Sequence, residues 1–227
     1  MAFFLIIYGF NSFSQNSVIR YEVPPGDNLT RISNKFDVTI DDIKEFNGLT
    51  SDIIHFHQIL YIPIKDTTDN NKYTERLCLK KVYYSQIGVR EKTGHNDGDQ
   101  VESYLNSAGL GKGYPWCASF VFWTFTQCGD TLDIKYPAWV PSYFPNDKLI
   151  LVRNEFKLRN PMFGDLIGIW FNSKGRLAHI GFYDGENKKF YFTVEGNTNI
   201  AGSREGDGVY RKRRIKRQVH SISSWSN

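Results

Sequence analysis

A wholly polar stretch, residues 65–72 (KDTTDNNK), divides this chain of 227 residues into two parts. It has no hydrophobic periodicity, which is typical of a linker. The total length suits one large domain or two smaller ones. The polar stretch favours two: residues 20–64 before it and residues 73–227 after it.

The composition is that of a globular protein, with 41% hydrophobic and 23% charged residues. These values exclude disorder, collagen and coiled coil for the bulk of the chain. No apolar run reaches the roughly 18 residues that span a bilayer, which excludes a polytopic membrane protein. Aromatic residues make up 15%. They favour a β-rich core, with a sugar-stacking surface as the alternative.

The net charge of +4 comes from one segment, residues 211–217 (RKRRIKR), which holds six basic residues. Without it the charge is 4 − 6 = −2, so the rest of the chain is mildly acidic. No nucleic-acid reading motif accompanies it, and we expect no nucleic-acid partner. We interpret the segment as a solvated strand with charged edges; an anion-binding patch is the alternative.

Residues 1–14 are typical of a signal peptide. The apolar core FFLIIYGF is followed by small residues at positions −3 and −1 of a cut after Ser14. No Lys or Arg precedes the core, which departs from the pattern; a buried strand or a short anchor is the alternative. Cleavage would leave no transmembrane anchor and predicts a secreted, periplasmic or wall-associated protein, in which a disulfide is permissible.

Residues 20–64 predict the order strand, helix, helix, strand. Residues 21–23 alternate as in a strand, and Asn28 suits the N-cap of a first helix. Residues 39–42 (TIDD) match a capping box that begins a second helix, which ends at Asn47-Gly48. Residues 59–63 (ILYIP) form the second strand.

The same segment carries YxVxxGDxLxxI, then VT, NGL and QxLYIP, and it resembles a LysM module. The resemblance implies binding of N-acetylglucosamine units of peptidoglycan or chitin in a groove between two loops. The implied groove residues are Gly26, Asp27, Asn28, Leu29 and Thr30, with Leu49, Ile53 and Ile54 opposite. His57 departs from the family, which usually has Gly before Gln58. His55 and His57 could ligate a metal, but no third ligand lies close in sequence; we expect no metal and no cofactor.

The second part begins with helices from Tyr73 and over residues 99–106, and then reads PWCASFVFW. Pro115 suits the first position of a helix, which places Cys117 in its first turn. Unpaired N–H groups and the helix dipole stabilise a thiolate there. A small buried cysteine is the alternative.

Short strands with turns between them follow Gly164, which predicts an antiparallel sheet and an α+β domain. A thiol nucleophile needs a base and an orienting group. His179 begins one strand. Glu195 and Asn197 share a face of the next strand, so either could hold the imidazole.

The strings IGVREKTG, YPWCASFV, FGDLI, AHIGF and VEGNTN resemble the CHAP family of cysteine peptidoglycan amidases and endopeptidases. The resemblance implies a papain-like (CHAP/NlpC-type) domain with N-terminal helices packed on the sheet. It implies that Cys117 attacks an amide carbonyl, that His179 is base and then acid, and that Glu195 or Asn197 assists. Trp116 either lines the cleft or packs in the core. Cys78 and Cys128 could form a bridge, but sequence does not give their separation.

These patterns predict a secreted bacterial hydrolase that cleaves an amide bond of peptidoglycan and is tethered to it by the LysM module. Its partners would be the glycan and its stem peptides. The alternatives are a non-catalytic peptidoglycan-binding protein with a degenerate hydrolase domain, and another thiol acyl-transfer enzyme.

Overall fold

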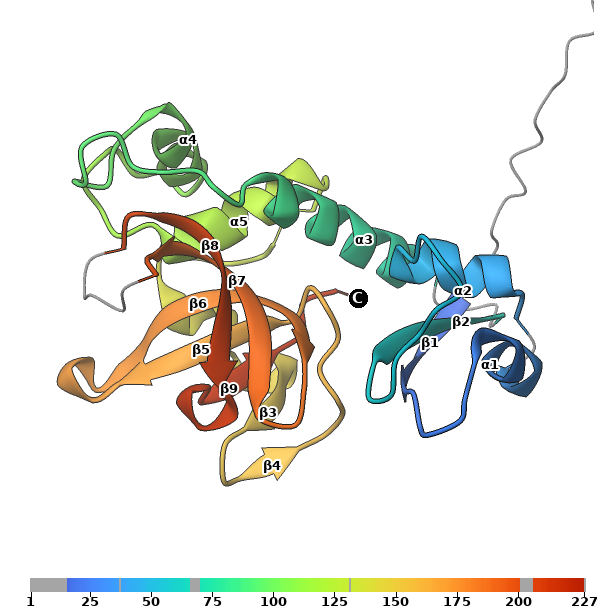
Figure 1. Ribbon diagram of the computed structural model, residues 1–227. Coiled ribbons are helices and arrows are strands. Elements are labelled where there is room, and N and C mark those ends of the chain that lie inside the picture. Colours follow the sequence, from blue (N-terminus) through green and yellow to red (C-terminus); the bar gives the residue numbers. More distant parts are fainter. Residues whose placement is uncertain (1–15, 37, 66–69, 131, 201–205, 227) are drawn as a thin grey trace, which may run out of the picture. The chain divides into compact units, whose positions relative to one another are not determined.

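The computed structural model describes residues 16–36, 38–65, 70–130, 132–200 and 206–226 (Figure 1). The chain divides into two compact units, Met1–Tyr73 and Thr74–Asn227. The proposed signal peptide lies outside the described residues. No helix within these ranges has both the length and the apolarity to span a membrane.

The first unit has the predicted order of elements. Strand β1 (Asn16–Glu22) pairs antiparallel with β2 (Ile59–Lys65), and α1 (Leu29–Phe36) and α2 (Ile40–Asn47) lie between them in sequence. One apolar cluster unites the four elements. Its buried members are Val23, Leu29, Ile32, Val38, Ile43, Leu60 and Ile62.

Side-chain caps fix both helices of the first unit where the sequence predicts them. Asn28 Oδ1 accepts a hydrogen bond from the N–H of Arg31 at 2.9 Å, which caps α1. Thr39 and Asp42 bond reciprocally at 3.0 and 3.1 Å, which is a capping box for α2. The amide of Asn47 bonds both backbone groups of Tyr61, so the end of α2 is fixed to β2.

The described residues from 70 onward form the helices α3 (Asn70–Ser85), which begins just before the boundary between the units, α4 (Asp99–Ser107) and α5 (Cys117–Gln127). Of the segment expected to be a linker, Lys65 lies in β2 and residues 70–72 lie in α3, while residues 66–69 lie outside the described ranges. A disulfide joins Cys78 in α3 to Cys128, the residue after α5, with 5.8 Å between their Cα atoms.

A seven-stranded antiparallel sheet follows, in the order β4-β3-β9-β5-β6-β7-β8. Its strands are β3 (Leu149–Val152), β4 (Phe156–Lys157), β5 (Leu166–Phe171), β6 (Arg176–Glu186), β7 (Phe190–Thr198), β8 (Gly208–Ile215) and β9 (Ser221–Ser223). Four 3-10 turns complete the unit: Val140–Tyr143, Asn146–Lys148, Asn172–Lys174 and Lys216–Gln218. The antiparallel sheet was predicted, with successive strands in the regions of β5, β6, β7 and β8, whereas β3, β4 and β9 were not predicted.

Helix α5 packs against the sheet beside β6 and β7 (Figure 1). Phe120 of α5 meets Phe182 of β6 with ring centres 6.0 Å apart. A Cβ at Gly196 of β7 would lie 2.7 Å from the Trp116 ring and 2.9 Å from Phe120. This glycine therefore lets β7 approach the first turn of α5, where the candidate nucleophile lies.

Candidate functional site

Cys117 is the first residue of α5, and Trp116 is its N-cap. Pro115 therefore precedes the helix instead of opening it, but the thiol lies in the first turn as predicted. Cys117 is buried, with 6% of its surface exposed. The other two cysteines of the chain form the disulfide, so Cys117 carries the free thiol.

The imidazole of His179 on β6 is the side chain that acts on the Cys117 thiol. Burial raises the pKa of the thiol, but hydrogen bonding and charge from His179, together with the backbone N–H groups of Ile180 and Ala118, lower it by more. The net pKa of Cys117 is lowered, which favours the thiolate.

His179 lies between the thiol and a carboxylate. Its Nε2 is 2.8 Å from Oε2 of Glu195, which leaves Nδ1 for the sulfur. Burial lowers the pKa of His179, but hydrogen bonds and charges from Cys117 and Glu195 raise it to about 9. The geometry thus favours an imidazolium beside a thiolate.

Glu195 is fully buried on β7 and is held from three sides. Arg214 of β8 donates to both carboxylate oxygens, from Nε at 2.8 Å and from Nη2. The Thr193 hydroxyl donates to Oε1 at 2.5 Å. Burial raises the pKa of Glu195, but Arg214 and His179 together hold it far below its usual value. Glu195 is therefore ionised at neutral pH.

A glycine on the neighbouring strand makes room for Glu195. A Cβ added to Gly181 of β6 would lie 2.5 Å from Cγ of Glu195. Real side chains do not approach that closely, so the carboxylate reaches His179 across a position that only glycine leaves open.

Asn197 is placed differently from Glu195. Its amide donates to Oδ1 of Asn96 at 3.0 Å and to Oε1 of Glu91 at 3.3 Å. Trp116 Nε1 donates to the same Glu91 oxygen at 2.8 Å. Trp116 is fully buried. Asn197 and Trp116 thus share Glu91, which ties the loop before α4 to both β7 and the start of α5. Of Glu195 and Asn197, Glu195 is the residue that hydrogen-bonds to His179.

Arg214 is the residue of the candidate site that the sequence did not predict. The basic run was interpreted as a solvated strand, but it reaches three buried carboxylates. Arg214 binds Glu195, Arg211 binds Asp184 at 2.8 Å, and Lys216 binds Glu186 at 2.6 Å. The sequence did contain one indication of these pairs: the basic segment follows closely after the strands that carry the three acidic residues.

The first unit has a hollow of about 520 Å³. Its lining residues are Gly48, Leu49, Thr50, Ser51, Ile53, His55, Phe56, His57 and Gln58. Leu49 and Ile53 of the implied groove line it, whereas Ile54 packs against the core.

The residues implied on the opposite loop do not line this hollow. The Gly26 carbonyl accepts from Arg31 Nη1 at 2.7 Å, and Asp27 accepts from the Tyr21 hydroxyl. Asn28 caps α1, Leu29 is buried in the core, and Thr30 is exposed in the first turn of α1.

His57 keeps the turn that a glycine makes in similar modules. Its φ of 62° is in the left-handed region, and its N–H bonds to the Val23 carbonyl at 2.9 Å. Its Nδ1 lies 2.5 Å from Oε1 of Glu22. The described ranges contain no group of three or more side chains that could hold a metal ion.

Comparison with known proteins identifies the first unit. Residues 21–63 match the LysM domain. A probable peptidoglycan endopeptidase LytE of Bacillus subtilis is 36% identical over 50 residues, and this similarity lies in the LysM region. The match covers 22% of this chain and 15% of that protein. Residues 21–63 are therefore a LysM domain, joined to a second unit of mixed helix and antiparallel sheet.

Proposed function

We propose that this chain is a wall-associated hydrolase that cleaves an amide bond of peptidoglycan through Cys117. The observation that carries the proposal is the chain of interacting side chains Cys117–His179–Glu195–Arg214, whose first three members are buried. A structural cysteine needs neither a hydrogen-bonded imidazole nor a carboxylate held behind it.

The chemistry follows from this order. The Cys117 thiolate attacks the amide carbonyl carbon, and the carbonyl π electrons move to oxygen. Free N–H groups at the first turn of α5 stabilise the resulting oxyanion. As the intermediate collapses, the C–N bond breaks and His179 gives its proton to the leaving amine. Water, deprotonated by His179, then attacks the thioester, releasing a carboxylic acid and restoring the thiol.

The architecture supports a papain-like, CHAP-type assignment for the second unit. Its nucleophile begins a helix, and its base and acid lie on adjacent antiparallel strands, β6 and β7. Glu195 is proposed as the carboxylate that orients His179. Asn197 and Trp116 are proposed to shape the cleft through Glu91.

The LysM domain supports the choice of peptidoglycan as the substrate. LysM modules bind N-acetylglucosamine-containing glycans, and the similar protein is named a peptidoglycan endopeptidase. We assign glycan binding to the loop of Gly26, Asp27, Asn28 and Thr30, with Leu49, Ile53 and Ile54 opposite. Binding would keep the second unit near the wall and raise its effective substrate concentration. Wall association outside the cytoplasm follows from this assignment.

Digestion of purified peptidoglycan, with product mass spectrometry, tests the proposal. Wild type should release fragments and Cys117→Ala should release none, while both bind the wall. Free stem peptides would identify an amidase, whereas shortened or uncrosslinked muropeptides would identify an endopeptidase. Equal binding with no products from either protein would refute the catalytic assignment.

A further inference from the structure

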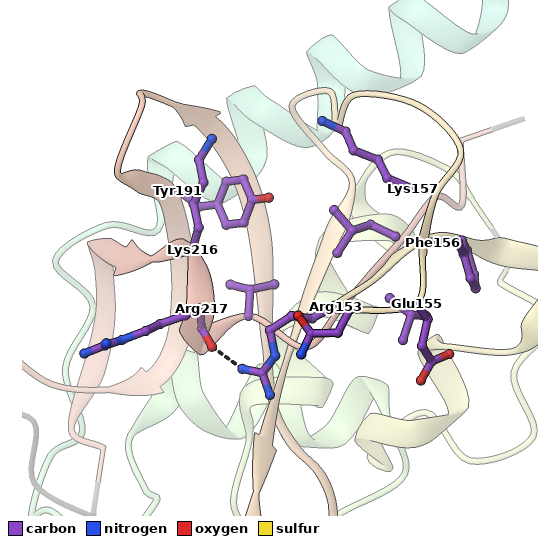
Figure 2. Close-up of a pocket in the computed structure, with 11 residues that line it drawn as sticks. Arg153, Glu155, Phe156, Lys157, Tyr191, Lys216 and Arg217 are labelled. Atoms are coloured by element: carbon purple, nitrogen blue, oxygen red, sulfur yellow. Dashed lines mark hydrogen bonds between the residues drawn. The ribbon is translucent and has the colours of Figure 1, made fainter.

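A second hollow of about 520 Å³ lies in the second unit, and none of the proposed catalytic residues lines it (Figure 2). The β3–β4 hairpin, residues 151–157, forms one wall. Lys216, Arg217 and Val219 form the other wall, and Tyr191 of β7 lies between them. Its volume is in the range of small-ligand sites.

The charge in this hollow is strongly positive. Four of its lining residues are basic (Arg153, Lys157, Lys216 and Arg217), and one is acidic (Glu155). Lys216 is paired with Glu186 at 2.6 Å. The other three basic side chains have no carboxylate partner among the residues that the structure describes; Arg153 instead donates to the Arg217 backbone carbonyl. Like charges gathered around one hollow favour an anion between them.

Tyr191 supplies a second, independent observation. Only 6% of its surface is exposed, and its ring packs on Tyr183 with centroids 5.7 Å apart. Its hydroxyl has no hydrogen-bond partner within the described part of the chain, and Figure 2 shows it pointing into the space between the two walls. The carboxylate of Glu155 points away from that space in the same view. A hydroxyl that faces this space without a protein partner is free to donate a hydrogen bond to a ligand or to water.

We propose that this hollow binds an oxyanion, phosphate or carboxylate, carried on a sugar or polyol chain. Arg153 and Lys157 would neutralise the charge, and the Tyr191 hydroxyl would donate to an anion oxygen; the Arg217 side chain points away from this space (Figure 2). Leu151, Val152 and Phe156 would contact the apolar faces of the chain that carries it. Tyr191 and Glu195 lie four residues apart on one face of β7, roughly 13 Å along the strand, so this site is separate from the thiol.

The test measures binding to the full chain carrying Cys117→Ala, by calorimetry at low and moderate salt. The probes are a poly(glycerol phosphate) oligomer and polygalacturonate, which distinguish a phosphodiester source from a carboxylate source. Binding to either probe supports the site and identifies its source. Binding to neither overturns the proposal.

Matched variants distinguish binding at this hollow from general electrostatic attraction between the probe and the protein. Arg153→Ala/Lys157→Ala should weaken binding by about tenfold or more. Lys81→Ala/Lys112→Ala, with the same loss of charge elsewhere, should weaken it by less than about threefold. Tyr191→Phe should weaken it by about fivefold, because it removes one hydrogen bond and keeps the packing. Equal losses in the two double variants, or no loss in Tyr191→Phe, would overturn the proposal. Cys117→Ala removes the catalytic thiol from every arm, so the result does not depend on the proposed hydrolysis.

Discussion

Among the described residues, the ion pairs of the LysM-containing unit lie at the surface, whereas those of the second unit have buried carboxylates. Glu22 and His57 are half exposed or more, and Asp52, the partner of Lys44, is 70% exposed. In the second unit, Asp165, Asp184, Glu186 and Glu195 are all at most 8% exposed. Exposed ion pairs contribute little to stability, but breaking a buried pair leaves a buried charge without its partner, which is destabilising. The second unit thus uses charge to fix its architecture and its candidate site.

The largest effect is expected at Arg76. Its guanidinium is buried and bonds to Asp165 at 2.7 Å, to the Phe163 carbonyl at 2.7 Å and to Ser224 at 3.0 Å. Arg76→Met would leave Asp165 to Arg159 alone and should lower the free energy of unfolding of the second unit by about 3–5 kcal/mol. Lys44→Met, the surface counterpart, should lower the free energy of unfolding far less, because solvent screens that exposed pair. Urea denaturation measures both, and similar losses would contradict the contrast.

Arg214→Met should destabilise the second unit and should also move the pH dependence of Cys117. Without the Arg214 cation, the negative charge of Glu195 is less compensated. That charge favours the protonated forms of nearby groups, so the pKa values of His179 and of Cys117 both rise. The midpoint of Cys117 alkylation by iodoacetamide should move up by about one pH unit. Lys212, whose charge also acts on Glu195, would partly compensate.

Arg214→Lys keeps the charge and should restore most of this shift, although it loses the two-point contact. A purely structural role for Arg214 predicts a lower alkylation rate in both variants with an unchanged midpoint. That pattern would show that Arg214 does not position Glu195.

Gly181→Ala should displace Glu195, and we expect a smaller effect than from the substitutions of Arg76 and Arg214. The added methyl group would overlap Cγ of Glu195, so the carboxylate must move away from His179. Alkylation of Cys117 near neutral pH should slow by about tenfold, in proportion to the thiolate lost. Gly111→Ala meets no atom within 4 Å and serves as the control. Unchanged alkylation in Gly181→Ala would mean that Glu195 does not set the state of His179.

His57→Gly should have the smallest effect, although it removes an ion pair. Glycine adopts the φ of 62° without strain, and the exposed pair with Glu22 contributes little. The melting temperature of the LysM-containing unit should stay the same or rise slightly. A clear loss of stability would show that this surface pair matters and would weaken the contrast between the units.

The sequence predicted the first unit well because its signals are local. Caps at Asn28 and Thr39 and the stop at Asn47-Gly48 each lie within a few residues of what they determine. Helix position and strand parity predicted a candidate site of Cys117, His179 and either Glu195 or Asn197, but they could not choose between the last two; Glu195 is the one that contacts His179. Short β9 was missed because it pairs with β3 and β5, far from it in sequence. Arg214 was missed for the same reason: its partner Glu195 is identified only by the pairing of β7 with β8.

The most direct test of the account is the pH dependence of Cys117 alkylation in the folded protein. The contacts with His179 lower the pKa of the thiol, and the pKa of His179 is raised to about 9, so the ion pair should persist across neutral pH. Folded wild type should therefore react as a thiolate well below pH 8.5, the usual midpoint of a free thiol. In urea the midpoint should return to that value. A folded-state midpoint at or above 8.5 would contradict the activation of Cys117.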